Sequence, residues 1–534
     1  MSKIATGARG LRKLYRLETE ERYGVLRDTL RNGAQWGLLA LVAYAVARSV
    51  VYAAVGKPFW FDEVLTQVIC RQGSVSAMWG ALRRGVDGNP PAFYLVERSV
   101  AWFIPNEHIG YRLLSVIGFA ATLYLVYVFV KMRNGGPRAL LCSALLLITP
   151  LFTLYAEEAR PYSLVTACIA LALVCYQRAP AAPWVIGMFL SLVLAALVHY
   201  YAVLIFLPFF LAELTVVYQT KRVRFGVWAA LLVAVVPTGI SWPVLMWMKQ
   251  NWGPHFWARN AALNEVSATY AAFFRIESPW GTAVAGLAIL MLVAGLVRRT
   301  PQTNAMEGLP KAPAAERVLV LALVALPMIG YLMAKITHGP YVERYFLPTI
   351  LGIAASVGYA LGQVKPKSAL VAAVFVGLAI GSQEFGFWRM LGHWQRPADI
   401  VAPIANLAGI TRYADLPIVV SDVGVYVEFW HYAPPELLRR VVTLPDPENA
   451  VNYSGTDTVD RLVIALRSCE PIAVEDLAHF EAEHQTFLLY SNGSRIDWLP
   501  ARLAHDGDQL RLLGRQLGGS AYLVELKAPA PGTD

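Results

Sequence analysis

Long apolar runs recur between residues 34 and 386 of the chain, and short polar loops separate them. Each run is long enough to cross the hydrocarbon core of a bilayer as a helix, allowing for tilt. The pattern predicts about eleven transmembrane helices, at 34–55, 107–130, 138–154, 161–177, 183–199, 201–218, 226–247, 281–297, 318–336, 345–362 and 368–386. We therefore expect an α-helical polytopic membrane protein.

The first polar loop after a predicted span, 56–106, is long and carries an amphipathic pattern. Residues 64–84 and 91–103 alternate apolar and polar positions at helical spacing, but they are too short and too polar to span a membrane. Asn89-Pro90-Pro91 separates the two stretches, and proline cannot continue a helix. The loop is therefore predicted to hold interfacial helices that lie along the membrane surface.

The pattern changes after residue 386, where Pro, Asp, Glu and Arg become frequent. Short apolar runs with helical stretches between them predict buried strands at 417–422, 440–444, 461–466 and 520–526. No glycine-rich phosphate loop opens a helix there, so nucleotide binding is not indicated. The expected organisation is a basic N-terminal segment at 1–33, a transmembrane domain at 34–386 and a soluble α/β domain at 387–534.

Basic residues concentrate at the N-terminus and in alternate loops, for example at Arg133, Lys221 and Arg298. The positive-inside rule places these loops in the cytoplasm. An odd number of spans then puts the C-terminal domain outside. The same orientation predicts outer loops at 56–106, 155–160, 199–201, 248–280 and 337–344.

The composition agrees with a membrane protein, since 56% of the 534 residues are hydrophobic and only 16% are charged. Soluble domains usually contain about 25% charged residues. The net charge of +9 is spread over short loops rather than gathered in one patch, so no nucleic-acid partner is expected. The five cysteines show no CxxC spacing and three lie inside apolar spans, which indicates neither a disulfide framework nor a zinc site.

Ionisable and aromatic side chains gather in the predicted outer loops. The first loop contains Phe59-Trp60-Phe61-Asp62-Glu63, in which two carboxylates directly follow an aromatic triplet. Asp62 alone could be a helix cap, because Asp favours that position. A charge near hydrocarbon is costly unless it is solvated or used, and here several loops bring such charges to one depth. The set comprises Asp62, Glu63, Arg112, Glu157, Glu158, Arg160, Tyr162, His199, Tyr200, Arg344 and Tyr345.

This mixture of side chains suits sugar transfer from a phosphate-linked lipid. A carboxylate can act as general base on an acceptor hydroxyl. Arginine can hold a phosphate by paired hydrogen bonds and stabilise it as a leaving group. Aromatic rings suit the faces of sugars and the membrane interface. Because a lipid phosphate enters sideways from the bilayer, its cations must lie at headgroup depth.

The order of these motifs resembles the GT-C glycosyltransferases, most closely the protein mannosyltransferase and aminoarabinose transferase group with an RgtA/B/C/D-like domain. The resemblance covers residues 34 to about 360. It rests on Phe61-Asp62-Glu63, Asn89-Pro90-Pro91-Ala92-Phe93-Tyr94, Tyr111-Arg112-Leu113-Leu114-Ser115, Glu157-Glu158-Ala159-Arg160-Pro161-Tyr162-Ser163-Leu164, His199-Tyr200-Tyr201 and Glu343-Arg344-Tyr345-Phe346-Leu347-Pro348. Asn89 departs from the pattern, since the family often has histidine there.

The resemblance implies a multi-pass enzyme of the bacterial cytoplasmic (inner) membrane with its site facing the periplasm. It implies a polyprenyl-phosphate sugar donor, such as an undecaprenyl-phosphate sugar, inversion at the anomeric centre, and a glycan, lipid or protein acceptor. Asp62 is the implied general base, with Glu63 beside it in the catalytic pair. The remaining implied roles are donor-phosphate or lipid binding by Arg344, Arg160, Arg112 and Tyr345, and donor or acceptor binding by Glu157, Glu158, His199, Tyr200, Asn89 and Tyr162.

Two other functional classes stay open at this point. A lipid or glycan transporter (a flippase) would place polar groups at mid-membrane, often in paired halves, whereas this sequence places them at one face and shows no internal repeat. A non-catalytic scaffold would tolerate loss of Asp62. No metal ligand or other cofactor is assigned: His199, His255 and His338 map to the outer side without HxxxH or HxH spacing. Some relatives use a divalent ion and others do not.

Overall fold

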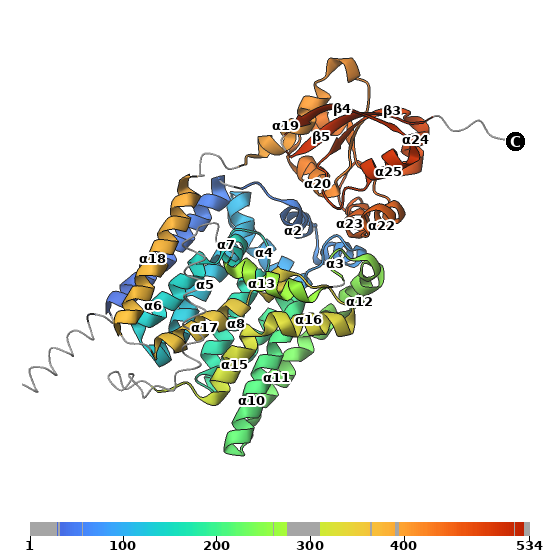
Figure 1. Cartoon of the computed structure of the whole chain (residues 1–534). Coiled ribbons are helices and arrows are strands. Elements are labelled where there is room, and N and C mark those ends of the chain that lie inside the picture. The colour runs from blue at the N-terminus through green and yellow to red at the C-terminus, as the bar shows by residue number, and fades with distance from the viewer. Residues whose placement is uncertain are drawn as a thin grey trace, which may run out of the picture.

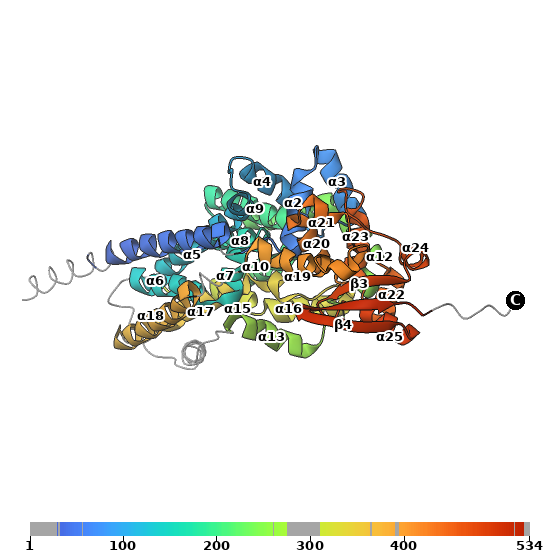
Figure 2. The ribbon, with the colours of Figure 1, turned by 90° about the horizontal axis from the view of Figure 1, so that it is seen from above.

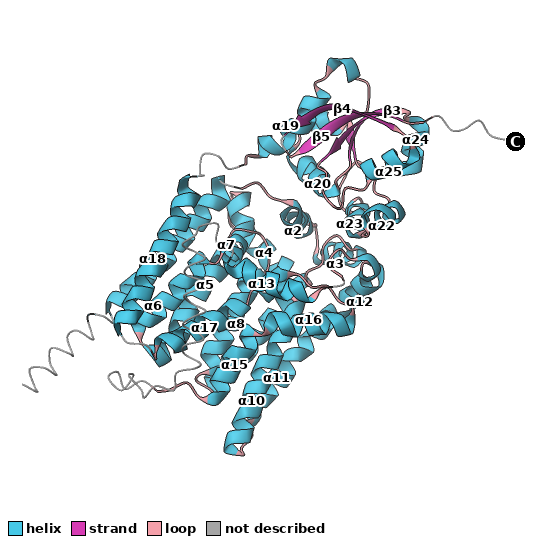
Figure 3. Cartoon of the chain, in the orientation of Figure 1, coloured by secondary structure: helices cyan, strands magenta, loops and turns pink. Residues whose placement is uncertain are grey.

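The computed structural model describes residues 29, 32–55, 57–259, 261–274, 310–363, 366–389, 395–516 and 518–527. Helices make up most of this described part of the chain, and within it a single small sheet lies near the C-terminus (Figure 3). The helices of residues 32–389 form one body, and the sheet with its helices lies at one end of that body (Figure 1).

Four helices of the described chain are long and apolar enough to cross a membrane, and three bent helix pairs raise the number to seven if each pair is one span. The three pairs bend by 78°, 58° and 60°, and prolines stand at the breaks, as Pro150 and Pro327 show. The predicted spans 161–177, 183–199 and 345–362 correspond to apolar helices of 15, 17 and 13 residues. The predicted span 281–297 lies outside the described residues.

The elements of the helical body run from the first helix, Asn32–Val55, to α18. The bounds are α2 Phe61–Arg71, α3 Val75–Arg84, α4 Pro91–Ala101, α5 Glu107–Asn134, α6 Gly136–Ala144, η1 Leu145–Ile148, α7 Pro150–Ala156, α8 Tyr162–Tyr176, α9 Ala182–Val198, η2 Tyr200–Ile205, α10 Phe206–Thr220, α11 Phe225–Val235, η3 Val236–Ser241, α12 Trp242–Asn251, η4 Gly253–His255, α13 Leu263–Phe274, α15 Ala314–Val324, α16 Leu326–Thr337, η6 Glu343–Phe346, α17 Thr349–Leu361 and α18 Pro366–Arg389.

The polar loop 56–106 is helical, as its amphipathic pattern predicts, but the predicted stretch 64–84 divides into two helices, α2 and α3, and α4 follows them. Local sequence explains the bounds of α3. Ser74 caps its first turn by accepting a hydrogen bond from the Ala77 amide, and Gly85 ends it at a φ of +89°. Pro91 occupies the first position of α4, where no amide hydrogen is needed.

Close backbone contact sets how the central helices pack. A Cβ at Gly118 of α5 would lie 2.7 Å from the amide nitrogen of Leu164, so the backbones of α5 and α8 meet there. Near the last turn of α5, Glu316 of α15 accepts hydrogen bonds from Arg133, Gln177 and Tyr359. This buried network joins four helices, since the partners lie on α5, after α8 and on α17.

Residues 397–525 form a five-stranded sheet in the order β2-β1-β3-β5-β4, flanked by helices. Strands β1, β2 and β3 are parallel, whereas β5 pairs antiparallel with β3 and β4. The bounds are α19 Pro397–Ala408, η8 Thr411–Tyr413, β1 Ile418–Val420, α20 Val423–Tyr432, α21 Pro435–Leu438, β2 Val441–Val442, α22 Pro447–Ser454, α23 Thr458–Leu466, α24 Leu477–Glu483, β3 Thr486–Ser491, α25 Leu499–Asp506, β4 Gln509–Gln516 and β5 Gly519–Glu525.

The predicted strand at 461–466 is wrong, because these residues belong to α23. A short apolar run fits a buried helix as well as a strand. The ion pair between Asp457 and Arg461, four residues apart, is a contact that a helix makes and a strand does not. The sheet therefore takes its third parallel strand from Thr486–Ser491 instead.

Candidate active site

Asp62 lies in the first turn of α2, where its carboxylate faces two guanidinium groups. Its Oδ2 atom is 3.7 Å from Nη2 of Arg160 and 3.6 Å from Nη2 of Arg344. Both separations exceed a normal hydrogen bond, and Oδ2 has no hydrogen-bond partner among the described residues. The Asp62 side chain is 15% exposed. The carboxylate is thus largely buried beside two positive charges, and its Oδ2 atom keeps an unused acceptor position.

Arg160 is fixed in the turn between α7 and α8 by contacts that do not use the Asp62 carboxylate. Its Nη1 atom donates to Oδ2 of Asp87 at 2.7 Å, to Oγ1 of Thr66 at 3.1 Å and to the carbonyl oxygen of Asp62 at 3.1 Å. The close ion pair of Arg160 is therefore with Asp87 and not with Asp62. The guanidinium therefore stands next to Asp62 without neutralising it by a direct hydrogen bond.

Arg344 lies in η6 among aromatic rings. The centre of its guanidinium group is 5.9 Å from the ring centroids of Tyr162 and Trp257 and 6.0 Å from that of Tyr345. These distances suit cation–π attraction. The Nε atoms of Arg344 and Arg160 are buried and have no hydrogen-bond partner among the described residues. Both side chains keep donor capacity beside the Asp62 carboxylate.

Glu63, the neighbour of Asp62, points in another direction and is fully buried against Arg112. Arg112 donates to both carboxylate oxygens at 2.7 Å, and its remaining hydrogens bind the carbonyl oxygens of Ala53, Lys57 and Pro58. Burial alone raises the pKa of Glu63, but the charges on Arg112 and Lys57 outweigh it and lower the pKa below its ordinary value. The pair joins α2 to α5 and the end of the first helix.

The acidic turn Glu157–Glu158 is buried and paired with cations from the first helix and its outer end. Arg48 bonds Glu157 and also reaches Oε2 of Glu384 on α18 at 2.8 Å, while Lys57 bonds Glu158. Burial raises the pKa of Glu157 to about 7, against the opposing charges of Arg48 and Lys57. This turn therefore connects the site to the first and last helices of the body.

His199, Tyr345 and Tyr162 pack ring against ring beside the two arginines. The His199 centroid lies 5.3 Å from that of Tyr162 and 5.0 Å from that of Tyr345. Burial, together with Arg160 and Arg344, lowers the pKa of His199 to about 3, so its ring is neutral. Tyr200 follows in η2 and is half-buried. Asn89 is buried, and its Nδ2 atom lacks a hydrogen-bond partner among the described residues.

Several residues of this region were not singled out from the sequence: Arg48, Lys57, Asp87, Glu384 and Glu428. Arg48 and Glu384 stand within apolar spans, and a charge there is costly unless it is paired. That rule is the signal that could have found these two. Asp87 and Lys57 lie in loops, where a charge is ordinary, so the sequence carries no comparable signal for them.

Among the described residues, no group of three or more His, Cys, Asp and Glu side chains converges in a way that could hold a metal ion. His255 lies 3.8 Å from Asp457, the residue before α23, and His338, the residue after α16, is exposed. Neither histidine contacts the Asp62 carboxylate. A metal thus stays unassigned.

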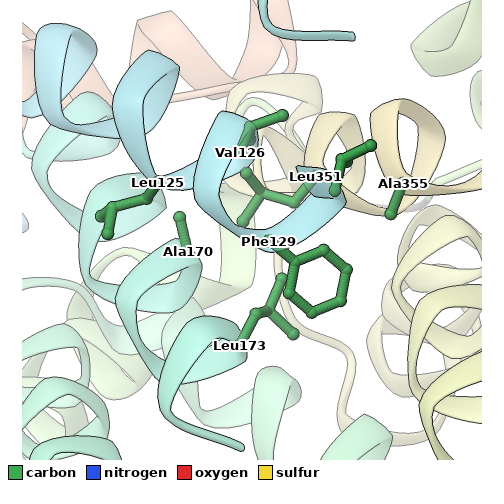
Figure 4. Close-up of a pocket in the computed structure, with 8 residues that line it drawn as sticks. Leu125, Val126, Phe129, Ala170, Leu173, Leu351 and Ala355 are labelled. Atoms are coloured by element: carbon green, nitrogen blue, oxygen red, sulfur yellow. The ribbon is translucent and has the colours of Figure 1, made fainter. Parts of the chain in front are cut away.

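A small apolar cavity lies between α5, α8 and α17, away from these charged groups (Figure 4). Phe129, Leu173 and Leu351 are among its lining side chains. All eight lining residues are apolar, so they offer no hydrogen bond to a polar ligand. The cavity is a packing gap within the bundle.

The C-terminal unit contacts the loop that carries Asp62. Helix α20 lies beside α2 (Figures 1 and 2). Glu428 of α20 accepts a hydrogen bond from the Phe61 amide at 2.8 Å, and the hydroxyl of Tyr432 accepts one from the Phe59 amide at 2.5 Å. The backbone on both sides of Trp60 is therefore held by α20.

Glu428 is expected to make the protein's stability depend on pH. Burial raises its pKa to about 7; the Phe61 amide and Lys57 oppose this, while Asp422 and Glu63 add to it. Because the pKa is raised on folding, the stabilising contribution is complete below about pH 4.5 and is lost as the pH rises through 7. Between pH 5 and 8 this loss lowers the unfolding free energy by on the order of 3 kcal/mol, and with it the thermal midpoint. We expect Glu428→Gln to remove this part of the pH dependence, so that the midpoint falls less over the same range. Thermal unfolding at a series of pH values measures it, and an unchanged slope would contradict it.

Comparison with known proteins finds similarity in structure rather than in sequence. No family model and no curated protein sequence matches the chain. The structure of ArnT from Cupriavidus metallidurans in the apo state matches with a TM-score of 0.56 at 12% identity, covering 92% of this chain and 98% of that one. ArnT from the same organism bound to undecaprenyl phosphate matches with a TM-score of 0.54 at 14% identity, covering 91% and 97%. The chain therefore has the GT-C fold, the fold of the aminoarabinose transferase.

Proposed function

We propose that this protein is an integral-membrane glycosyltransferase that moves a sugar from a polyprenyl-phosphate donor to an acceptor hydroxyl. One observation carries the proposal: Oδ2 of Asp62 lies 3.7 and 3.6 Å from two guanidinium groups and has no hydrogen-bond partner among the described residues. That atom can accept the proton of a hydroxyl while the guanidinium groups face an anion. The GT-C fold and the ArnT structure bound to undecaprenyl phosphate support the same reading.

In the proposed reaction, Asp62 is the general base for the acceptor hydroxyl. The hydroxyl oxygen attacks the anomeric carbon from the side opposite the phosphate, and its proton passes to Oδ2 of Asp62. The bond between that carbon and the phosphate oxygen breaks, so the anomeric centre inverts. The electron pair leaves with the phosphate, which departs as the polyprenyl phosphate.

Arg344 and Arg160 would stabilise the negative charge that develops on the leaving phosphate. Each keeps an unpartnered Nε within the site, and Arg344 is the more exposed of the two at 19% of its side chain. Tyr162, Tyr345 and Trp257 surround Arg344 with apolar faces. We assign the phosphate first to Arg344, because Asp87 already binds Arg160 directly.

Glu63 and Arg112 have a supporting role in this proposal. Both are fully buried and bind each other through two hydrogen bonds, so neither is free to meet a ligand without breaking the pair. Glu157 and Glu158, paired with Arg48 and Lys57, would shape the donor or acceptor side of the site. With the candidate site among the outer loops, the proposed location is the bacterial inner membrane, with the reaction on its periplasmic face.

The proposal is tested with purified full-length protein, a panel of undecaprenyl-phosphate sugars and a membrane extract as acceptor source. Mass spectrometry should detect free undecaprenyl phosphate and a sugar-bearing product. Arg344→Ala should weaken undecaprenyl phosphate binding about 10-fold or more, because a charge-assisted contact is lost. Arg317→Ala, which changes an arginine of α15 outside the site, is the matched control. Donor that crosses proteoliposome membranes intact would instead support a transporter, and unchanged affinity of Arg344→Ala would contradict the assigned phosphate contact.

A further inference from the structure

We propose that helix α20 of the C-terminal α/β unit positions the Asp62-bearing helix α2, so that the catalytic site is complete only with this unit in place. The inference rests on the proposed function for its catalytic meaning, but the contacts that carry it are independent of any substrate. Glu428 and Tyr432 are the positioning residues.

The two contacts flank the start of α2. Phe61 is the first residue of the helix and Trp60 its cap, so Asp62 stands one residue beyond the amide that Glu428 binds. The first amides of a helix have no partner within the helix and need an acceptor from elsewhere. Glu428, more than 360 positions further along the chain, supplies that acceptor, and Tyr432 binds the Phe59 amide two residues earlier.

Aromatic packing reinforces the hydrogen bonds. The buried Phe59 ring stacks on His108 at a centroid distance of 4.3 Å and meets the edge of His431 at 5.9 Å. His431 in turn packs against Tyr432 at 4.5 Å. The segment before α2 is therefore enclosed between α5, which carries His108, and α20. A rigid enclosure of this kind fixes where the Asp62 backbone begins.

The same unit also touches the segment next to Arg344. Asp457, the residue before α23, lies 3.8 Å from His255, and two residues after His255 Trp257 stands beside Arg344. The carbonyl oxygen of Ala258 then binds the amide of Tyr341, close to η6. The C-terminal unit thus reaches both the helix that carries the base and the loop that faces the phosphate-binding arginine.

Small displacements at this position have large consequences. The Asp62 carboxylate lies 3.7 and 3.6 Å from the two arginines, and its buried Oδ2 atom has no hydrogen-bond partner among the described residues. A shift of α2 would change the distances from Asp62 to both arginines. A misplacement of about 1 Å can lower a rate about 10²-fold.

The first test measures the position of residue 62 without any substrate. Asp62→Cys is introduced with Cys469→Ser, because Cys469 is the half-exposed one of the five cysteines and the other four are buried. The rate of labelling by 2-aminoethyl methanethiosulfonate is then compared after Glu428→Ala or Tyr432→Phe. We expect each change to alter the rate at least 3-fold. Glu428→Gln should restore it, since the amide oxygen of glutamine still accepts the Phe61 hydrogen bond.

The second test measures transfer in the protein that retains Asp62. Glu428→Ala is expected to lower kcat at least 10-fold and to change KM for the lipid donor less than 3-fold, with Glu428→Gln near the original rate. Glu436→Gln, on the exposed surface of α21, is the matched control. The positioning role would be overturned if the labelling rate were unchanged by Glu428→Ala and Tyr432→Phe and kcat were unchanged by Glu428→Ala. If the unmodified protein transfers no sugar but the labelling rates change as expected, the proposed function fails and the positioning of α2 stands.

Discussion

Replacing Asp62 with asparagine is expected to abolish sugar transfer, with a fall in rate of about 10³-fold or more, while folding and lipid binding are kept. Asparagine has nearly the same shape but cannot take a proton from the acceptor hydroxyl, and general-base catalysis contributes about 10²- to 10⁴-fold. The measurement is the initial rate of undecaprenyl phosphate release by the purified variant.

The same change, Asp62→Asn, also has an expected effect on the binding of undecaprenyl phosphate. Asp62 lies between Arg160 and Arg344 and partly offsets their charge. Removing its negative charge should leave undecaprenyl phosphate binding unchanged or make it tighter, because like charges repel. Asp415→Asn, at an exposed position of the C-terminal unit, is the matched control and should leave transfer and binding unaltered. A normal transfer rate in Asp62→Asn would exclude Asp62 as the base.

Hydrophobic patterning predicted the helical body well, but not the form of each helix. Bilayer-length runs indicate where helices lie, whereas bends arise from local backbone chemistry. Pro150 follows the break after η1, and Pro327 opens α16 after the break at Ala325. Proline is the residue that bends a helix, so these breaks were readable in principle. Their angles depend on packing against neighbours and were not.

The sequence groups the carboxylates and arginines into one candidate site, but it does not predict which carboxylate pairs with which arginine. Asp62 and Glu63 are adjacent, and adjacent residues on a helix point about 100° apart. One carboxylate therefore faces Arg160 and Arg344 while the other is buried on Arg112. A linear sequence places both in one motif and cannot say which of them faces Arg160 and Arg344. Only the folded arrangement around α2 separates them, because Arg112 of α5 takes one carboxylate and leaves the other to the two arginines.

The site residues that were not predicted are partners that lie far away in the sequence. Asp87 binds Arg160 across 73 positions of chain, and Glu428 binds the Phe61 amide across 367. Neither residue belongs to a motif with fixed spacing, and each stands where a charge is ordinary. Such partners follow from how the loops fold over one another, which no local pattern encodes.

Removing Arg112 is expected to destabilise the protein by about 3–5 kcal/mol, since a fully buried charge on Glu63 loses its partner. Arg112→Met keeps much of the volume and tests the charge rather than the packing. The double variant Glu63→Leu with Arg112→Met should recover most of the loss, because replacing both members of a buried pair by apolar groups is often nearly neutral. Thermal or denaturant unfolding in detergent measures the difference.

The chain offers a matched surface pair for comparison. Arg71 and Glu107 also join α2 to α5, but their side chains are 49% and 52% exposed. Solvent screens such a pair, so Arg71→Met should change the unfolding free energy by about 1 kcal/mol or less. The two pairs connect the same helices, and the contrast isolates the effect of burial. If Arg112→Met lowered the unfolding free energy no more than Arg71→Met does, the pair of Glu63 and Arg112 would not be what holds α2 in place. A role for the two residues in the proposed reaction would then be favoured.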